Sequence, residues 1–455
     1  MSYRVTHQPA PVPTAVPDEL TVRGGRPLHG SVTTSGFKHS LVTTVAAACL
    51  GQGTARIDNC PMIAETPTLA ALVERMGGSA LLTGTTLTLN ASGIATNSLD
   101  PELSAAIHGS VYLAPMLLAR FGSVTVPGTG GCRIGDGSQG RRPVSHYVDV
   151  LGRFGARGRT LDDGGFTVAV TGGLRACAID LADYWTPLGS GPYHSGATKV
   201  AVLAAAVARG TTVLDHVYGK PDVLDMLPLL RQAGVGIEEP APGRLVVQGL
   251  PDLPAGASRA VLPPDLIEVV TWCCASVLCP EGLTVHGAGM DRAVRALAPE
   301  LRVLRDLGVP LEAGTDTLTV GPGRTPLAPV DVLVAADGVF SDSHPFIALL
   351  ASLAEGTSRI RDTVWANRFG YADQLAELGV KLDVRDGAVS LHGPWSAAVP
   401  GRRLLAGDLR AAAVLLLAAL HVPGTTHLAG VGHLARGYAD LVGQLVRLGA
   451  DITEA

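Results

Sequence analysis

The chain has 455 residues, of which 47% are hydrophobic, 4% are aromatic and 16% are charged, and its formal net charge is -5. This length exceeds what one hydrophobic core organises and favours two domains. The slightly acidic charge offers no field for a nucleic acid or an anionic membrane, so small molecules are the expected partners. Seven cysteines without a matched pair of CxxC motifs favour a reduced, cytoplasmic compartment and suggest no metal site.

The N-terminal segment, residues 1–19, contains four prolines and lacks the apolar run of a signal peptide. We therefore predict a disordered arm. The most apolar stretch of the chain, residues 411–422, is shorter than the about 20 helical residues that span a bilayer. We expect no membrane segment and interpret this stretch as a core helix.

A two-helix pattern recurs six times along the chain. Each unit has an apolar helix, then a glycine that leads a β-branched strand, then an amphipathic helix that ends at a second glycine. The leading glycines are Gly53, Gly122, Gly210, Gly282, Gly356 and Gly424. An all-apolar helix such as 200–207 must be buried on most sides, whereas an amphipathic helix such as 371–378 covers a sheet. Two short alternating segments joined by a turn follow, so the predicted unit is βαβαββ.

Three units in each half predict an α/β protein of two inside-out domains, with the helices buried and the sheets outside. Two strand-like segments within residues 20–34 precede the first helix, while the sixth unit ends on an incomplete hairpin. The N-terminus is therefore expected to complete the last unit. One domain is predicted over 38–255 and the other over 20–37 plus 256–455, with 251–257 as the linker. A chain that crosses twice favours closure of the domains over a cleft that holds the active site.

Polar residues recur where the helices begin. The residues that open the six apolar helices are Lys38, His108, Gly196, Glu268, Asp342 and Arg410, and those near the start of the second helices include Arg142, Lys220, Arg292, Arg368 and Arg436. Helix N-termini carry free N–H groups and partial positive charge, which suit anions. Arginine binds carboxylate and phosphate through two hydrogen bonds. We therefore predict a pocket for a small molecule with more than one anionic group.

One unit is longer than the others, and its surplus lies in the glycine-rich segment 128–143. Irregular loops of this kind often act as lids. The segment contains Cys132 beside Arg133 and Arg142, and such cations favour the reactive thiolate form. Residues 135–140 formally match GxGxxG, but no βαβ unit surrounds them, so we expect no dinucleotide cofactor.

Several of these segments together resemble the enolpyruvyl transferase family, from about residue 20 to the end. They are Ser35-Gly-Phe-Lys38, the Cys132 loop with Arg142-Pro143, Asn367-Arg368-Phe369, Asp408-Leu-Arg410 and Arg436-Gly-Tyr438. The chain is more similar to the UDP-N-acetylglucosamine enolpyruvyl transferases (the MurA branch) than to the shikimate-pathway enzymes. The resemblance implies the same inside-out fold and transfer of the enolpyruvyl group of phosphoenolpyruvate to an acceptor hydroxyl with loss of phosphate. It implies neither a cofactor nor a metal.

The resemblance also implies a role for each matching residue. Phosphoenolpyruvate is expected to be bound through its phosphate and carboxylate by five cations: Lys38, Arg142 and Arg436 for the phosphate, and Arg368 and Arg410 for the carboxylate. The reaction needs a base for the acceptor hydroxyl and an acid for the vinyl carbon. Asp342 is the expected base and Cys132 the expected acid, and Lys38 is counted with them as catalytic.

The positions that depart from the cell-wall enzyme lie on the acceptor side. His39, His108, Ser145 and Lys220 stand where that enzyme has Asn, Arg, Asp and Glu, and Ala366 replaces another Glu. The predicted acceptor site consists of His39, His108, Ser145, Ser195, Gly196, Lys220, Glu268 and Asp342. Lys220 in place of a carboxylate favours an extra anion on the acceptor, such as a terminal monophosphate.

Three functions follow from these residues. The favoured one is enolpyruvyl transfer to uridine monophosphate, the acceptor used by the branch of the family that serves peptidyl-nucleoside antibiotic pathways. The second is transfer to UDP-N-acetylglucosamine in peptidoglycan synthesis. The third is a non-catalytic relative that binds a phosphorylated metabolite, against which stands the retention of both Asp342 and Cys132. No pattern indicates the oligomeric state.

Overall fold

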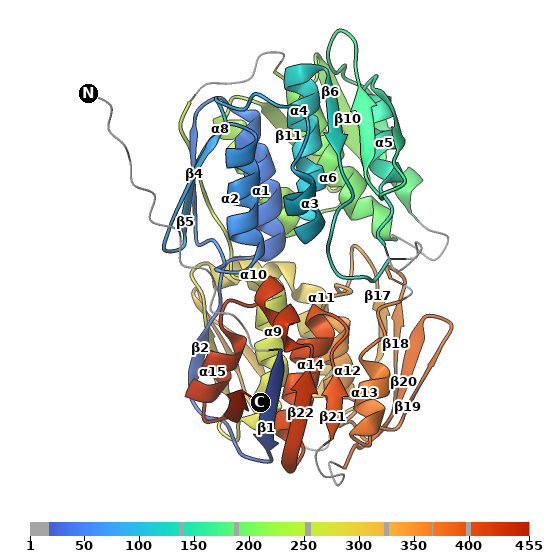
Figure 1. Cartoon of the computed structure of the whole chain (residues 1–455). Helices are drawn as coiled ribbons and strands as arrows, with labels where there is room; N and C mark the ends of the chain where they lie inside the picture. Colours follow the sequence, from blue (N-terminus) through green and yellow to red (C-terminus); the bar gives the residue numbers. More distant parts are fainter. Residues whose placement is uncertain are drawn as a thin grey trace, which may run out of the picture.

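The computed structural model describes residues 18–135, 141–185, 191–250, 256–322, 327–365, 367–396 and 402–454. These residues form a two-domain α/β protein with six small sheets, five of four strands and one of three. In Figure 1 the first domain, mostly blue to green, lies above the second, which is yellow to red apart from the blue strands of the N-terminal segment. Within the described ranges, we find no helix with the length and apolarity that a membrane crossing requires.

The repeating unit is clearest in one sheet of the first domain. Its elements are β9 (Ala178–Asp180), α6 (Pro192–Val207), β10 (Thr211–Asp215), α7 (Pro221–Leu224), α8 (Leu227–Gln232), β11 (Gly236–Ala241) and β12 (Arg244–Gln248). The strand order is β11-β12-β10-β9, with β9 parallel and β12 antiparallel to β10. The predicted βαβαββ unit is confirmed.

The other two units of the first domain follow the same plan. One contains α1 (Lys38–Leu50), β3 (Thr54–Asp58), α2 (Glu65–Arg75), β4 (Ser79–Thr83), β5 (Thr86–Asn90) and the edge strand β13 (Ser258–Val261). The other contains α3 (Pro101–Ala106), η1 (Gly109–Leu113), α4 (Ala114–Phe121), β6 (Ser123–Val126), α5 (Ser145–Arg153), β7 (Arg157–Thr160) and β8 (Phe166–Ala169), and η3 (Leu181–Tyr184) follows β9.

The second domain repeats the unit three times. The first has β2 (Ser31–Thr33), α9 (Leu266–Ala275), η4 (Ser276–Leu278), β14 (Leu283–His286), α10 (Met290–Ala296), α11 (Ala298–Leu307), β15 (Leu311–Ala313) and β16 (Thr317–Val320). The second has β17 (Asp331–Val334), α12 (His344–Ala351), β18 (Gly356–Asp362), α13 (Ala372–Glu377), β19 (Leu382–Arg385) and β20 (Ala388–Gly393). The last has β21 (Arg403–Leu405), α14 (Leu409–His421), β22 (Gly424–Ala429), η5 (Val431–Arg436), α15 (Leu441–Arg447), β23 (Asp451–Glu454) and β1 (Glu19–Gly24).

The N-terminus and the C-terminus share one sheet. β1 lies between β22 and β23 and pairs antiparallel with both, so the first strand of the chain fills the place of the last strand of the sixth unit. Glu19 already belongs to this strand, opposite Ala429. The predicted arm therefore ends before Glu19, and residues 1–17 lie outside the described residues.

The two crossings between the domains run side by side. The backbone N–H of Phe37 donates to the carbonyl of Pro263 at 2.8 Å. Strand β13 pairs in parallel with β3 of the first domain, and Leu262 belongs to the first core. The predicted start of the second domain at 256 is therefore wrong, because β13 is still an edge strand of a first-domain sheet and the chain crosses only after Leu262. Of the predicted linker, 251–255 lie outside the described residues.

Each domain has its own core around buried, nearly all-aliphatic helices. In α14 every residue from Leu409 to Leu420 is buried, which confirms the interpretation of the most apolar stretch as a core helix. A helix buried on all sides must be built of small and aliphatic residues that interdigitate at near-crystalline density. Truncating such a residue, for example Leu415→Ala, is expected to cost about 2–5 kcal/mol of folding free energy. Rigid buried helices of this kind hold their N-termini in fixed positions.

Candidate active site

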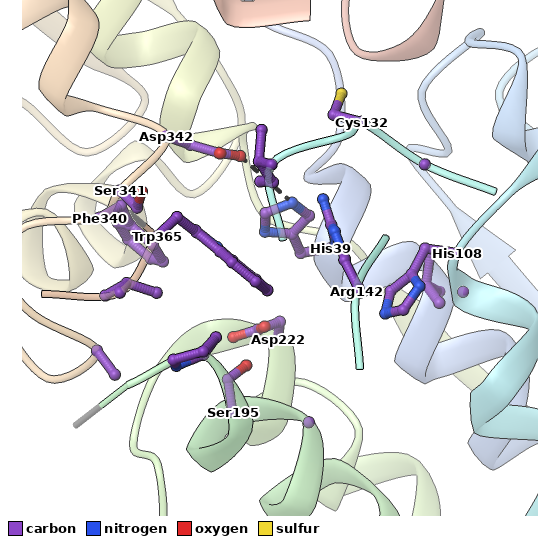
Figure 2. Close-up of a pocket in the computed structure, with 18 of the residues that line it drawn as sticks. His39, His108, Cys132, Arg142, Ser195, Asp222, Phe340, Ser341, Asp342 and Trp365 are labelled. Carbon is purple, nitrogen blue, oxygen red and sulfur yellow. Dashed lines mark ion pairs between the residues drawn. The ribbon is translucent and has the colours of Figure 1, made fainter. Parts of the chain in front are cut away.

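A cavity between the two domains collects most of the predicted site residues. All but three of them line it, namely Lys38, His39, His108, Cys132, Arg142, Ser195, Gly196, Asp342, Arg368, Arg410 and Arg436. Figure 2 shows His39 and Arg142 in the middle of the group, with Asp342 on one side and His108 on the other. Most of the residues predicted at helix N-termini therefore meet here, whereas Glu268, Lys220 and Arg292 do not line the cavity.

Asp342 precedes α12 and is the centre of a buried charge cluster. Its Oδ1 forms an ion pair with Arg368, its Oδ2 lies 3.2 Å from Arg410 Nη2, and the same Oδ2 lies 3.7 Å from His39 Nε2. Burial by itself would raise the pKa of Asp342, but Arg368 and Arg410 outweigh burial and lower this pKa. Asp342 is therefore ionised at neutral pH. It can accept a proton only when these arginines form ion pairs with another group.

Arg410 is held both at its backbone and at its guanidinium group. The carboxylate of Asp408 caps α14 by accepting from the backbone N–H groups of Arg410 and Ala411. The Arg410 guanidinium donates to the hydroxyl of Tyr438 at 3.1 Å, and that hydroxyl contacts Thr271 Oγ1 at 2.7 Å. Arg410 Nε has no hydrogen-bond partner among the described residues. The guanidinium thus keeps donor capacity for a ligand.

Lys38 joins the two domains at the start of α1. Its backbone N–H donates to Asp265 Oδ2 at 3.0 Å, and Asp265 also caps α9. Its ammonium donates to Glu65 Oε1 and to the carbonyl oxygen of Arg436, both at 2.5 Å. Lys38 therefore contacts the backbone of Arg436, and both residues line the cavity. Glu65 was not predicted, because an acidic residue in the first turn of a helix is an ordinary surface feature.

The Cys132 loop follows β6 and reaches the second domain. Cys132 is half-buried and packs against the second-domain core. Asn367 Nδ2 donates to the carbonyl of Gly135 at 3.1 Å, and the Arg142 guanidinium lies 5.4 Å from the centroid of the Trp365 ring. These contacts hold the described part of the loop over the cavity. Residues 136–140, which carry the rest of the GxGxxG match, and Ala366 lie outside the described residues.

The first domain lines the cavity with histidines that burial keeps neutral. Burial lowers the pKa of His39 to about 4 and that of His146 to about 3, and it also lowers the pKa of His108. His108 contacts the hydroxyl of Tyr147 at 3.2 Å, whereas neither ring nitrogen of His146 has a hydrogen-bond partner among the described residues. Neutral imidazoles can both donate and accept, so this wall suits uncharged polar groups.

Gly196 contributes to this wall because it has no side chain. A Cβ atom there would lie 2.7 Å from His146 Nε2 and 2.9 Å from the Tyr147 hydroxyl, closer than real Cβ contacts come. Gly196 therefore shapes the cavity wall, because only glycine lets α6 approach α5 so closely. Its role in acceptor binding stays a prediction.

Three predicted acceptor residues do not line the cavity. Ser145 is exposed at the start of α5. Lys220 is buried, donates to the carbonyl of Gly338 at 2.5 Å and lies 3.3 Å from the centroid of the Phe340 ring, so its ammonium belongs to the contact between the domains. Glu268 accepts from the Ser35 backbone and hydroxyl at 3.0 and 2.7 Å, and burial raises its pKa to about 7.

The cavity carries an excess of positive charge. Its described lining has six cationic side chains, Lys38, Arg142, Lys199, Arg368, Arg410 and Arg436, against three carboxylates, Glu65, Asp222 and Asp342. With neutral histidines the difference is three positive charges. Within the described ranges, no group of three or more His, Cys, Asp and Glu residues could hold a metal ion. The cavity is thus suited to an anionic substrate bound by arginine and lysine.

Comparison with known proteins identifies the family. The family model described as EPSP synthase (3-phosphoshikimate 1-carboxyvinyltransferase) matches residues 22–445. The chain belongs to this family of enolpyruvyl transferases. The predicted family and the predicted enzyme class are therefore confirmed.

Relatives and solved structures agree with this assignment. The chain is 34% identical over 439 residues to the UDP-N-acetylglucosamine 1-carboxyvinyltransferase of Anaeromyxobacter dehalogenans, covering 96% of this chain and 99% of the relative. It is 46% identical to the enolpyruvyl transferase NikO from Streptomyces tendae, with a TM-score of 0.90 over 96% of this chain and 99% of that one. EPSP synthase from Acinetobacter baumannii, at 16% identity and a TM-score of 0.71 over 96% of this chain and all of that one (100%), supports the fold alone.

Proposed function

We propose that this enzyme transfers the enolpyruvyl group of phosphoenolpyruvate to a hydroxyl of a uridine nucleotide and releases phosphate, with uridine monophosphate as the preferred acceptor. The observation that carries the proposal is the positively charged cavity built around Asp342. A phosphate of charge about -1.5 to -2 and a carboxylate give phosphoenolpyruvate nearly the charge that balances this cavity. Lys38, Arg142 and Arg436 are assigned to the phosphate, and Arg368 and Arg410 to the carboxylate.

Binding of phosphoenolpyruvate would also activate the base. Arg368 and Arg410 are paired with Asp342 in the structure. A substrate carboxylate that takes these guanidinium groups competes with Asp342 for them. Because the two arginines are what lowers the pKa of Asp342, their engagement with the substrate raises this pKa toward the range of a useful base.

The chemistry then needs three proton transfers. Asp342 takes the proton of the acceptor hydroxyl while the oxygen of this hydroxyl bonds to C2 of phosphoenolpyruvate. The Cys132 thiol gives a proton to C3. The Cys132 thiolate then takes a proton back from C3 as phosphate leaves C2, and the double bond is restored in the product. The cations stabilise the phosphate as it leaves, and closure of the cavity would keep water from the intermediate.

The choice of acceptor rests on the pattern of similarity. The chain is 46% identical to the enolpyruvyl transferase NikO but 29% and 34% identical to two UDP-N-acetylglucosamine 1-carboxyvinyltransferases. The departures from that cell-wall branch include His39 and His108, which form the neutral wall of the cavity. UDP-N-acetylglucosamine remains the alternative acceptor. The position of both Cys132 and Asp342 on the cavity opposes a purely binding role.

The test is phosphate release from phosphoenolpyruvate, with uridine monophosphate and UDP-N-acetylglucosamine offered separately and the products weighed by mass spectrometry. The proposal expects release and a product heavier by one enolpyruvyl group with the monophosphate only. Release with the sugar nucleotide alone would establish the cell-wall reaction instead. No release with either nucleotide, while phosphoenolpyruvate still binds, would favour the non-catalytic alternative.

A further inference from the structure

A buried ion pair on the first-domain wall is not used by the chemistry described above. Lys199 lies on α6 and Asp222 on α7, both line the cavity, and the Lys199 ammonium contacts Asp222 Oδ2. Lys199 is 7% exposed and Asp222 only 1% exposed. Charged residues are seldom buried this deeply without a partner or a function.

The pair keeps hydrogen-bonding capacity that the protein does not use. Asp222 Oδ1 has no hydrogen-bond partner among the described residues, although the side chain is buried. The ammonium has three donors, and besides Asp222 its neighbours are the rings of Tyr112 and Tyr218, whose centroids lie at 5.5 and 5.8 Å. Asp222 therefore keeps one free acceptor, beside an ammonium for which the described residues show no hydrogen bond to a second acceptor.

The Asp222 carboxylate is turned toward the cavity. Figure 2 draws the Asp222 carboxylate beside Ser195, turned toward the space below Trp365 and His39. His39 connects this place to the base, since its Nε2 lies 3.7 Å from Asp342 Oδ2. The charges of Asp222 and Lys199 both reach His39, and they shift its pKa in opposite directions. A group bound by the pair and a group held at Asp342 would therefore occupy the same cavity.

The chemistry of the proposed acceptor supplies such a neighbouring group. Uridine 5′-monophosphate has only two free hydroxyls, at the vicinal 2′ and 3′ positions of the ribose. If one of them reacts at Asp342, the other is adjacent to it and needs its own partners in a buried site. A carboxylate is the group that proteins use to bind a ribose hydroxyl in dinucleotide sites.

We propose that the Lys199–Asp222 pair binds the non-reacting hydroxyl of the acceptor ribose. The free Asp222 oxygen accepts a hydrogen bond from this hydroxyl, and the Lys199 ammonium donates one to its oxygen. The inference rests on the proposed function, because it takes a nucleotide with a free vicinal diol as the acceptor. It makes Lys199 and Asp222 specificity-determining residues, which the sequence did not indicate.

The test combines a change in the enzyme with a change in the substrate. Uridine monophosphate is compared with its 2′-deoxy and 3′-deoxy forms by phosphate release. One deoxy form lacks the reacting hydroxyl and gives no product. The other form, called the reporter, keeps the reacting hydroxyl but lacks the adjacent one, so its rate measures how the enzyme recognises that adjacent hydroxyl. The wild-type enzyme is expected to use this reporter with a kcat/KM about 10- to 100-fold lower than for uridine monophosphate, as for a lost hydrogen bond to a charged group.

The decisive variant is Lys199→Met/Asp222→Leu. Replacing a buried ion pair with apolar residues of similar size usually preserves the fold. This variant is expected to have the same kcat/KM for uridine monophosphate and for the reporter. Both values should be close to the wild-type value for the reporter. Its KM for phosphoenolpyruvate should stay unchanged. The single variant Asp222→Asn, which keeps the side-chain size, is expected to lose most of the discrimination as well.

A matched control comes from the same domain. Arg153→Met/Asp183→Leu removes an ion pair outside the cavity and should leave the full discrimination. The inference is overturned if the wild type shows no discrimination, or if the Lys199→Met/Asp222→Leu enzyme keeps it. If no nucleotide releases phosphate, the proposed function fails, and the inference is judged separately by calorimetric binding of the three nucleotides. Equal affinities of the wild type for all three would then overturn it.

Discussion

The two walls of the cavity are built from different chemistry. The second domain supplies Asp342, Arg368 and Arg410, whose charges contact one another directly. Besides the cations Lys38 and Arg142, the first domain supplies His39, His108 and His146, which burial keeps neutral, three tyrosines and the self-neutralising Lys199–Asp222 pair.

This difference separates two tasks that one enzyme must perform. A dense set of cations stabilises a small, highly charged substrate and the charge that develops on it. Neutral donors and acceptors bind hydroxyls and amides, and they reject a wrong acceptor by leaving buried polar groups unpaired. We therefore expect mutations of Asp342, Arg368 and Arg410 to affect phosphoenolpyruvate and the chemical step. Mutations of the three histidines and of the Lys199–Asp222 pair on the first-domain wall are expected to affect the acceptor.

The largest effect is expected from Asp342→Asn, which keeps the size of the side chain but removes the base. We expect kcat to fall about 1,000-fold, within the usual range for a general base. Affinity for phosphoenolpyruvate should hold or increase, because Asp342 no longer competes for Arg368 and Arg410. Steady-state phosphate release and calorimetry measure the two quantities.

The control for this variant is Asp291→Asn, an exposed carboxylate whose ion pair lies on the surface. It should leave both quantities unchanged. A kcat for Asp342→Asn within tenfold of the wild type would remove Asp342 from the role of base.

The next largest effect is expected from a mutation in the Cys132 loop, which lies between the two walls. Cys132→Ser replaces a thiol with a far less acidic hydroxyl, so kcat should fall about 100-fold if Cys132 is the proton donor. The measurement is kcat at saturating levels of both substrates. Cys177→Ser changes a half-buried cysteine outside the cavity and should retain full activity. Unchanged turnover of Cys132→Ser would show that the acid is another group.

A smaller effect, confined to one substrate, is expected from Arg410→Lys. Lysine keeps the charge but loses the two-pronged contact with a carboxylate. We expect KM for phosphoenolpyruvate to rise about 10- to 30-fold with the acceptor KM unchanged, as measured by varying each substrate in turn. Arg447→Lys, at an exposed ion pair of the same domain, is the control. A rise in the acceptor KM alone would reverse the assignment of the walls.

The smallest effect concerns the pH dependence of stability. Because the pKa of His146 is about 3 in the folded protein, the unfolded chain binds the extra proton as pH falls below the ordinary histidine value of 6.5. Wild-type stability should therefore be greatest above pH 6.5 and should lose about 1 kcal/mol at pH 5.5 through this residue. In His146→Phe this part of the loss should vanish.

Urea unfolding at pH 7.5 and pH 5.5 measures the difference. The exposed His29→Phe serves as the control and should show the wild-type dependence. An identical pH dependence of the wild type and His146→Phe would mean that His146 is not held neutral, and the contrast between the walls would weaken.

The sequence was a good guide wherever a local pattern carries the structure. The glycine spacing predicted the βαβαββ unit, and the family motifs predicted the cations that now line one cavity. It was wrong by a few residues at the second crossing, because β13 has no local signal for the domain to which it belongs. Its membership is decided by the backbone hydrogen bonds to β3, which is far away in the chain.

For the acceptor side, the sequence indicated the right domain but not all of the residues. Lys220 was a natural choice as a cation near a helix start, yet its ammonium is bound to Gly338 across the interface. Lys199, in the middle of an apolar helix, carried no signal, and only the packing of α6 against α7 pairs it with Asp222 and leaves one carboxylate oxygen without a hydrogen-bond partner among the described residues.

The sequence by itself determined the family, the repeating unit and the identity of the charged residues, because periodicity, glycines and short motifs are properties of contiguous residues. Only the tertiary structure decided which charges are already neutralised, which histidines are neutral and which polar atoms remain free for a ligand. These properties depend on burial and on partners from distant segments, since desolvation and ion pairing act through space.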